Sequence, residues 1–112
     1  MKVLVADDSQ FMRKAIMQLI DAEVVEASTE EEAVNRFNEH KPDVVFLDVM
    51  MNEADSGIKA LRRIKEKSPD ARVVLVTSLK EDNCLVQEAF ELGIEGYLPK
   101  PFDKRELSKF LD

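Results

Sequence analysis

The sequence is poor in the residues that build disulfide frameworks, phosphate loops and membrane spans. Its single cysteine, Cys84, excludes an intramolecular disulfide framework and fits a reducing cytoplasm. None of its three glycines forms a phosphate-cradling loop after the first strand, which argues against a nucleotide or flavin binder. The apolar runs are far shorter than the roughly 20 residues that cross a bilayer. The opening run reaches Asp7 and Asp8 too early for a signal peptide, so we expect a cytoplasmic protein.

Basic residues are outnumbered by acidic ones. The chain has 16 Lys and Arg against 23 Asp and Glu, a net charge of −7. This balance excludes nucleic acid as a partner, because neutralising phosphates supplies most of that affinity. It equally disfavours anionic membrane surfaces. The 112 residues are 45% hydrophobic and 35% charged, which is typical of a globular chain. We therefore expect one domain over residues 1–112, a monomer, with neither a nucleic-acid nor a membrane partner.

The hydrophobic pattern predicts five strands that alternate with five helices. Continuous apolar runs place strands near residues 3–6, 24–25, 43–48, 72–77 and 95–98. Apolar residues at three-and-four spacing place helices near residues 12–20, 30–40, 58–67, 85–92 and 104–111. Ser28 and Thr29, each followed three residues later by Glu, and the pair Asp103 and Glu106 are capping-box patterns. Gly93 stands where a helix commonly ends.

The composition of the strands predicts their order in the sheet. The first, third and fourth strands are apolar throughout, which indicates burial on both faces. The second is short and flanked by Glu23 and Glu26, and the fifth runs into Pro99, which is tolerated mainly at an edge. Right-handed crossovers then favour the order 2-1-3-4-5. The predicted fold is a doubly wound (βα)5 flavodoxin-like α/β sandwich around a parallel sheet.

Three acids are expected to meet where the strand order reverses, between the first and third strands. Ligands of such sheets bind beyond the carboxyl ends of the strands at that point. Asp7 and Asp8 follow the first strand and Asp48 ends the third. Their charges repel one another and are costly to bury without a partner. Carboxylates with no His or Cys nearby suit a hard cation, and Mg²⁺ suits an open site that also takes a phosphate.

The ends of the last two strands add a hydroxyl and an ammonium. Thr77, followed by Ser78, ends the fourth strand, and Lys100 follows the fifth. A cation, a hydroxyl and a lysine around a carboxylate suit the binding of a phosphoryl group, with Asp48 as the nucleophile. Taken singly, these residues also fit ordinary strand-end acids, a cap and a surface lysine. Their combination on successive strand ends favours phosphoryl chemistry.

These pieces resemble the response-regulator receiver domain over essentially all 112 residues. The matching segments are Asp7-Asp8, Asp48, Thr77-Ser78 and Lys100-Pro101-Phe102. The resemblance implies that Asp48 accepts a phosphoryl group from a phosphohistidine of a sensor histidine kinase. It implies Mg²⁺ held by Asp8, Asp48 and the backbone carbonyl of Met50, with Asp7 helping through water.

The resemblance also implies how such a chain signals. Lys100 contacts the phosphoryl group, and the Thr77 hydroxyl moves to meet it. Tyr97 matches an aromatic switch position whose ring swings inward, which changes the face made by the fourth helix, the fifth strand and the fifth helix. That face is then the docking surface for a downstream protein. The Lys100–Pro101 bond is often cis in this family.

Within the family, the segment from Asp8 to Lys14 resembles chemotaxis regulators of the CheY type, which favours a flagellar motor target. Three departures stand out. The turn around residues 21–23 lacks the usual glycine, and the short last helix predicts a smaller output face. After Asp48, Asn52 stands where the family commonly has proline, and Gly57 comes one residue late. Without the proline we expect a less rigid loop.

Four other functions remain open from the sequence. The same residues serve phosphorelay intermediates and other stand-alone receivers. A receiver-shaped module that is never phosphorylated would tolerate the altered loop. A phosphatase with an aspartate nucleophile is disfavoured, because such enzymes carry a second acid two residues after the nucleophile and a cap domain. We therefore expect no enzyme activity beyond self-phosphorylation from small phosphodonors and autodephosphorylation.

Overall fold

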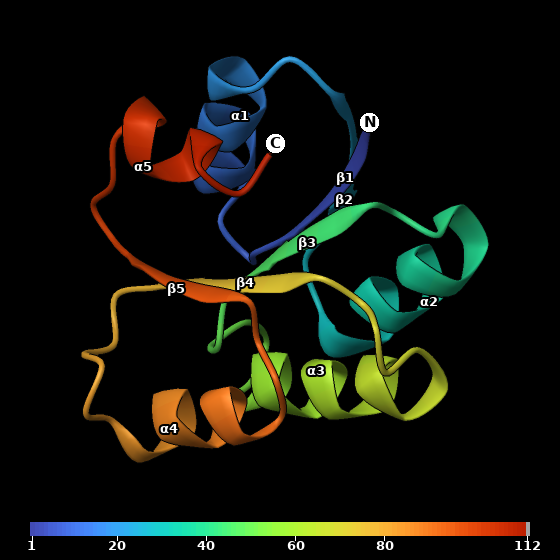
Figure 1. Cartoon of the computed structure of the whole chain (residues 1–112), viewed down its shortest axis with the longest axis vertical. Helices are drawn as coiled ribbons and strands as arrows, with labels where there is room; N and C mark the ends of the chain where they lie inside the picture. The colour runs from blue at the N-terminus through green and yellow to red at the C-terminus, as the bar shows by residue number, and fades with distance from the viewer. Residues whose placement is uncertain (112) are drawn as a thin grey trace.

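A computed structural model describes residues 1–111 and consists of five strand–helix units (Figure 1). The strands are β1 (Lys2–Ala6), β2 (Glu23–Ala27), β3 (Val44–Leu47), β4 (Val73–Thr77) and β5 (Gly96–Pro99). The helices are α1 (Gln10–Leu19), α2 (Glu30–His40), α3 (Ser56–Lys67), α4 (Cys84–Glu91) and α5 (Lys104–Ser108). The sheet order is β2-β1-β3-β4-β5 and all pairings are parallel, which confirms the predicted fold.

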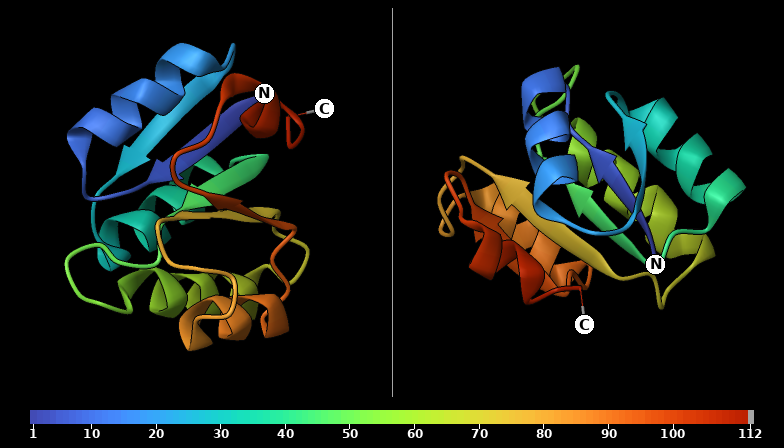
Figure 2. Two further views of the ribbon diagram at one scale, coloured as in Figure 1. Left: turned by 90° about the vertical axis from the view of Figure 1, so that its left-hand side faces the viewer. Right: turned by 90° about the horizontal axis from the view of Figure 1, so that it is seen from above.

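The register brings the ends of the central strands level. β1 lies beside β3 with Ala6 opposite Leu47, and the two strands point the same way in the right-hand view of Figure 2. β2 and β5 form the two edges of the sheet, as their charged and proline residues predicted. Residues that directly follow β1 and β3 therefore start from neighbouring points at the carboxyl end of the sheet.

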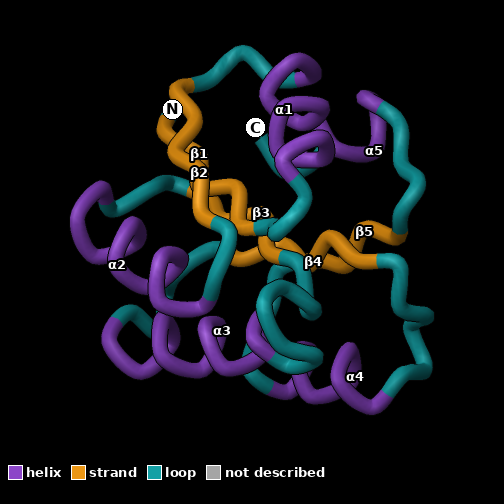
Figure 3. The backbone as a smooth tube through the Cα atoms, turned by 180° about the vertical axis from the view of Figure 1, so that it is seen from behind, coloured by secondary structure: helices purple, strands orange, loops and turns teal. Residues whose placement is uncertain are grey.

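Helices cover both faces of the sheet. α1 and α5 lie on one face, and α2, α3 and α4 lie on the other (Figures 1 and 3). Successive strand residues point to opposite faces, so each strand contributes to two apolar clusters. On β3, Val44 and Phe46 enter the cluster with Ile16 and Leu107, while the intervening Val45 enters the other. Burial on both faces explains why the inner strands carry almost no polar residues.

The caps agree with the sequence patterns in part. Asp103 and Glu106 form the predicted capping box of α5. Thr29 caps α2 by accepting the N–H of Glu32, but the Glu32 carboxylate accepts hydrogen bonds from Ser28 instead of closing a box on Thr29. Gly93 follows α4 with a φ of 94°, in the left-handed region that glycine adopts without steric cost.

Two elements differ in length from the prediction. β2 spans five residues instead of two, because its flanking acids stay at the partly exposed sheet edge while their backbone pairs with β1. α5 has five residues and ends at Ser108, which is even shorter than the apolar pattern indicated. Among residues 1–111, no helix combines the length and apolar character that a membrane crossing requires.

Candidate functional site

The predicted acids meet at the carboxyl edge of the sheet. The Asp7 N–H donates to the carbonyl of Ala27 at 2.9 Å, and the Asp48 N–H donates to the carbonyl of Ala6 at 2.9 Å. These backbone bonds extend the strand ladders by one residue and fix where each side chain begins. Asp7, Asp8 and Asp48 each offer a carboxylate oxygen, and these oxygens all lie within 4.8 Å of one another.

The donor set of this acidic cluster fits a hard divalent cation. Asp7 and Asp48 are buried, and Asp8 is exposed, so the cluster opens to solvent on one side. All three ligand atoms are carboxylate oxygens, the type that Mg²⁺ prefers, and an open side leaves room for water and a phosphate. The residues present therefore fit the predicted Mg²⁺.

Lys100 lies between the two buried acids. Its Nζ donates to Oδ2 of Asp7 at 2.8 Å and to Oδ2 of Asp48 at 2.9 Å. The backbone N–H of Lys100 donates to the carbonyl of Thr77 at 2.9 Å, which joins the end of β5 to β4. The Lys100–Pro101 peptide bond is cis, which confirms the expectation from the family resemblance.

Burial and charge act in opposite directions on these groups. Burial raises the pKa of Asp48, and the hydrogen bond and charge of Lys100 offset this only in part, while the Asp7 charge adds to the rise. Burial lowers the pKa of Lys100, but its hydrogen bonds to Asp7 and Asp48 outweigh burial and leave the pKa raised. One ammonium thus serves two carboxylates, so Asp48 is incompletely compensated without a second cation.

Thr77 and Tyr97 are joined through Leu79, which lies in the loop between β4 and α4. Thr77 is fully buried, and its side chain opposes the burial-driven rise in the pKa of Asp48 only slightly. Its Oγ1 accepts the N–H of Leu79 at 3.2 Å, and the Tyr97 hydroxyl donates to the carbonyl of Leu79 at 2.5 Å. The Tyr97 ring packs against Phe90 of α4 with centroids 6.5 Å apart. A short chain of contacts therefore runs from the acidic cluster to the surface of α4 and β5.

Ser78 and Met50 are placed differently from the other predicted site residues. The Ser78 side chain is exposed, and within residues 1–111 no hydrogen bond joins it to the acidic cluster. The side chain of Met50 is 40% exposed and lies outside the core, so only its backbone carbonyl is a candidate ligand.

The sequence did not single out Arg13 as part of the site. Its Nη1 donates to the backbone carbonyl of Asp7 at 2.7 Å, and its Nε donates to Glu26 at 2.9 Å. Hydrogen bonds from Lys14, then from Arg13, lower the pKa of Glu26. The clue in the sequence was positional: an arginine on the first turns of α1 reaches back to the loop before it. Arg13 holds the peptide that joins the two adjacent acids.

Gly57 packs directly against the backbone of Asp48. A Cβ at this position would lie 1.9 Å from the Asp48 carbonyl oxygen and 2.7 Å from Cα of Val49. The Gly57 N–H also donates to the carbonyl of Val49 at 2.7 Å. The close approach of α3 to the residue after β3 is therefore possible only with glycine here.

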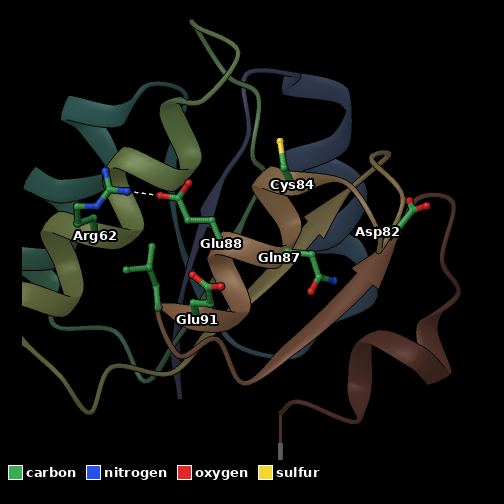
Figure 4. A pocket seen from close by; sticks show the side chains of 7 residues that line it. Arg62, Asp82, Cys84, Gln87, Glu88 and Glu91 are labelled. Carbon is green, nitrogen blue, oxygen red and sulfur yellow. Dashed lines mark hydrogen bonds and ion pairs between the residues drawn. The ribbon is translucent and has the colours of Figure 1, made fainter.

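A hollow elsewhere on the surface lacks comparable chemistry. It lies along α3 and α4, and Figure 4 shows an ion pair between Arg62 and Glu88 across it. The lining is mixed: three acids, Asp82, Glu88 and Glu91, stand beside Arg62, Gln87, Leu92 and Cys84. It contains none of the residues of the acidic cluster.

Known proteins share this sequence and arrangement. The family model described as the response regulator receiver domain matches residues 3–112. The chemotaxis protein CheY of Listeria monocytogenes is 36% identical over 116 residues, which cover 100% of this chain and 96% of that protein. Protein CcdB of Bacillus subtilis is 36% identical over 95% of this chain and 90% of its own length. The CheX–CheY–BeF3–Mg complex from Borrelia burgdorferi contains a chain that is 30% identical, with a TM-score of 0.86 over 98% of this chain and 85% of that one.

Proposed function

The chain belongs to the response-regulator receiver domain family, and from this premise we propose that it is a signalling switch phosphorylated on Asp48. Members of this family of the CheY type are signalling proteins and not classical enzymes. The observation that carries the proposal is the buried carboxylate of Asp48, which shares the ammonium of Lys100 with Asp7 and lies beside Asp8.

The proposed reaction is transfer from a phosphohistidine of a sensor histidine kinase. An oxygen of the Asp48 carboxylate attacks phosphorus, the new P–O bond forms, the P–N bond breaks, and the imidazole leaves and takes a proton from solvent. Lys100, which pairs with Asp48, would place positive charge beside the attacked phosphoryl group, and the Thr77 hydroxyl would move to contact it. Small phosphodonors supply the same group without a kinase, and water later hydrolyses the acyl phosphate.

Mg²⁺ would be held by Asp8, Asp48 and the backbone carbonyl of Met50, with Asp7 acting through water. When bound, this cation supplies the second positive charge that the three carboxylates and the incoming phosphate require. With that second positive charge in place, Lys100 would be the residue that contacts the phosphoryl group.

The signal is proposed to leave the site through Thr77 and Tyr97. A Thr77 side chain drawn toward a phosphoryl group gives up the N–H of Leu79, and the Leu79 carbonyl is the acceptor of the Tyr97 hydroxyl. A change at Thr77 therefore reaches the Tyr97 ring and its packing on Phe90. The face made by α4, β5 and α5 is then the docking surface for a downstream protein in the cytoplasm.

The favoured pathway is chemotaxis, because CheY proteins are among the relatives that match nearly the whole chain. The alternative is a phosphorelay intermediate or another stand-alone receiver. Phosphotransfer from each sensor kinase of the source organism separates the two: preferential transfer from the chemotaxis kinase supports the favoured pathway, and transfer only from another kinase excludes it.

Intact mass after incubation with acetyl phosphate and Mg²⁺ tests the acceptor. The wild-type chain gains one phosphoryl group, and the Asp48→Ala chain gains none. Asp70→Asn is the matched control, since Asp70 is an exposed acid before β4, away from the sheet edge. Labelling of Asp48→Ala at the wild-type rate would rule out this acceptor.

A further inference from the structure

The loop after Asp48 is organised around one buried hydroxyl. Ser56 begins α3 and is fully buried. Its Oγ donates to the carbonyl of Glu53 at 2.7 Å and accepts the N–H groups of Met51 and Glu53, each at 3.1 Å. One buried side chain thus bonds to three backbone groups of the loop.

These bonds fix the orientation of the Met50–Met51 peptide. Among residues 1–111 the only cis bond is Lys100–Pro101, so this peptide is trans and its C=O and N–H point in opposite directions. The Met51 N–H is directed into the loop, to Oγ of Ser56 and to the carbonyl of Glu53 at 3.1 Å. The carbonyl of Met50 consequently faces away from the loop interior.

We propose that Ser56 is a positioning residue that sets the direction of the Met50 carbonyl for the cation of the acidic cluster. This inference rests on the proposed function, in which that carbonyl is a ligand. Oxygen ligands of Mg²⁺ must lie close to octahedral positions. A Met50–Met51 peptide group that could rotate would therefore lower the affinity for Mg²⁺. Residues that hydrogen-bond to metal ligands and so orient them commonly change metal affinity by about 10- to 100-fold when they are removed.

The loop needs this constraint because it lacks the proline common in the family. Its C-terminal end is anchored by Gly57, whose N–H donates to the carbonyl of Val49 at 2.7 Å. Its outer part is tied by Asn52, whose Oδ1 accepts the N–H of Glu30 at 3.4 Å, and by exposed ion pairs from Lys59 to Glu53 and Asp55. The hydroxyl of Ser56 holds the backbone between these two anchors and, in this proposal, supplies a constraint in place of that proline.

Ser56→Ala tests the proposal through magnesium and not through activity alone. We expect the Kd for Mg²⁺, measured by titration calorimetry, and the Mg²⁺ concentration for half-maximal labelling by acetyl phosphate both to rise about tenfold. The labelling rate at saturating Mg²⁺ is expected to stay at the wild-type value. In the metal-free protein the Met51 amide is expected to exchange its hydrogen faster. Ser68→Ala, at the opposite end of α3, is the matched control and leaves all four quantities at their wild-type values.

Each outcome separates the possible failures. A Ser56→Ala chain that is less stable but has the wild-type Kd for Mg²⁺ would show a purely structural serine and overturn the inference. If Ser56→Ala does not fold, Ser56→Cys keeps the volume with a weaker acceptor, and a wild-type Kd for it overturns the inference equally. A wild-type chain that neither binds Mg²⁺ nor is labelled would refute the proposed function itself.

Discussion

Replacing Asp48 with asparagine is expected to stabilise the metal-free protein. Asparagine keeps the shape of the side chain and an oxygen that accepts from Lys100, but it removes one negative charge from the acidic cluster. In the wild-type protein that charge is buried and lies beside Asp7, and both effects raise the pKa of Asp48. The folded state therefore favours a neutral group at this position.

The distances give the size of the effect. At an effective dielectric constant of about 20, two unit charges at 4.8 Å, the upper limit of the separations in the cluster, repel by roughly 3.5 kcal/mol. Asp48 experiences this repulsion fully from buried Asp7 and partly from exposed Asp8. Attraction to Lys100 at 2.9 Å contributes roughly 5.7 kcal/mol on the same scale. Repulsion and attraction nearly cancel, so the cost of burying the carboxylate decides the sign. We expect a gain of about 1 kcal/mol, or about 4 °C in Tm.

Urea and thermal unfolding of Asp48→Asn, in chelator and in Mg²⁺, measure this gain. Because the folded pKa of Asp48 is raised, its penalty is full above that pKa and vanishes below the unfolded value of about 4. The gain should therefore be present at neutral pH, fade as the pH falls toward 4, and shrink in Mg²⁺, which stabilises only the wild-type cluster. Asp70→Asn should change nothing. An Asp48→Asn chain less stable than wild type in chelator at neutral pH would refute the reasoning.

Three further predictions address neighbouring groups. Lys100→Met leaves two buried carboxylates without a cation and should cost about 3 kcal/mol of unfolding free energy in chelator. Most of this loss should be recovered in the Asp48→Asn background, and a double-mutant cycle of urea unfolding measures the recovery. Gly57→Ala should destabilise the fold by about 2 kcal/mol and slow the labelling of Asp48, because its Cβ collides with the Asp48 carbonyl, whereas Gly93→Ala should lose stability alone. Glu95→Gln should cost up to about 1 kcal/mol at neutral pH. The hydrogen bond from Arg72 lowers the pKa of Glu95, so this stabilisation is lost progressively as the pH falls below the ordinary value of 4.5 and through the lowered pKa.

The strand order and the position of the acidic cluster were predictable because both follow from the sheet. Strands buried on both faces have distinctive composition, and the residues after them fall on one edge whatever the loops do. The positions of Asp7 and Asp48 directly after β1 and β3 were enough to predict that their side chains meet.

The supporting contacts were not predictable, because they depend on backbone paths without a repeating pattern. The hydroxyl of Ser56 acts through a loop of irregular turns, and Arg13 reaches a carbonyl that only the end of β1 places within its range. Glu32 bonds to Ser28 and not to the cap residue Thr29, since two arrangements of the same residue types satisfied one pattern. β2 is an edge strand, and its two glutamates interrupt the apolar run. The sequence pattern therefore predicted a strand shorter than the one that the backbone forms.

The ion pair between Lys100 and Asp7 joins residues 93 positions apart in the chain. A ribosome adds Asp7, Asp8 and Asp48 long before it adds Lys100, so the growing chain carries the three acids without their ammonium. The carboxyl end of the sheet acquires its balancing charge only when β5, which follows the other four strands of the sheet in sequence, docks on β4. In the order of synthesis, completion of the sheet and completion of the site are one event, and a nascent chain that stops before β5 has neither.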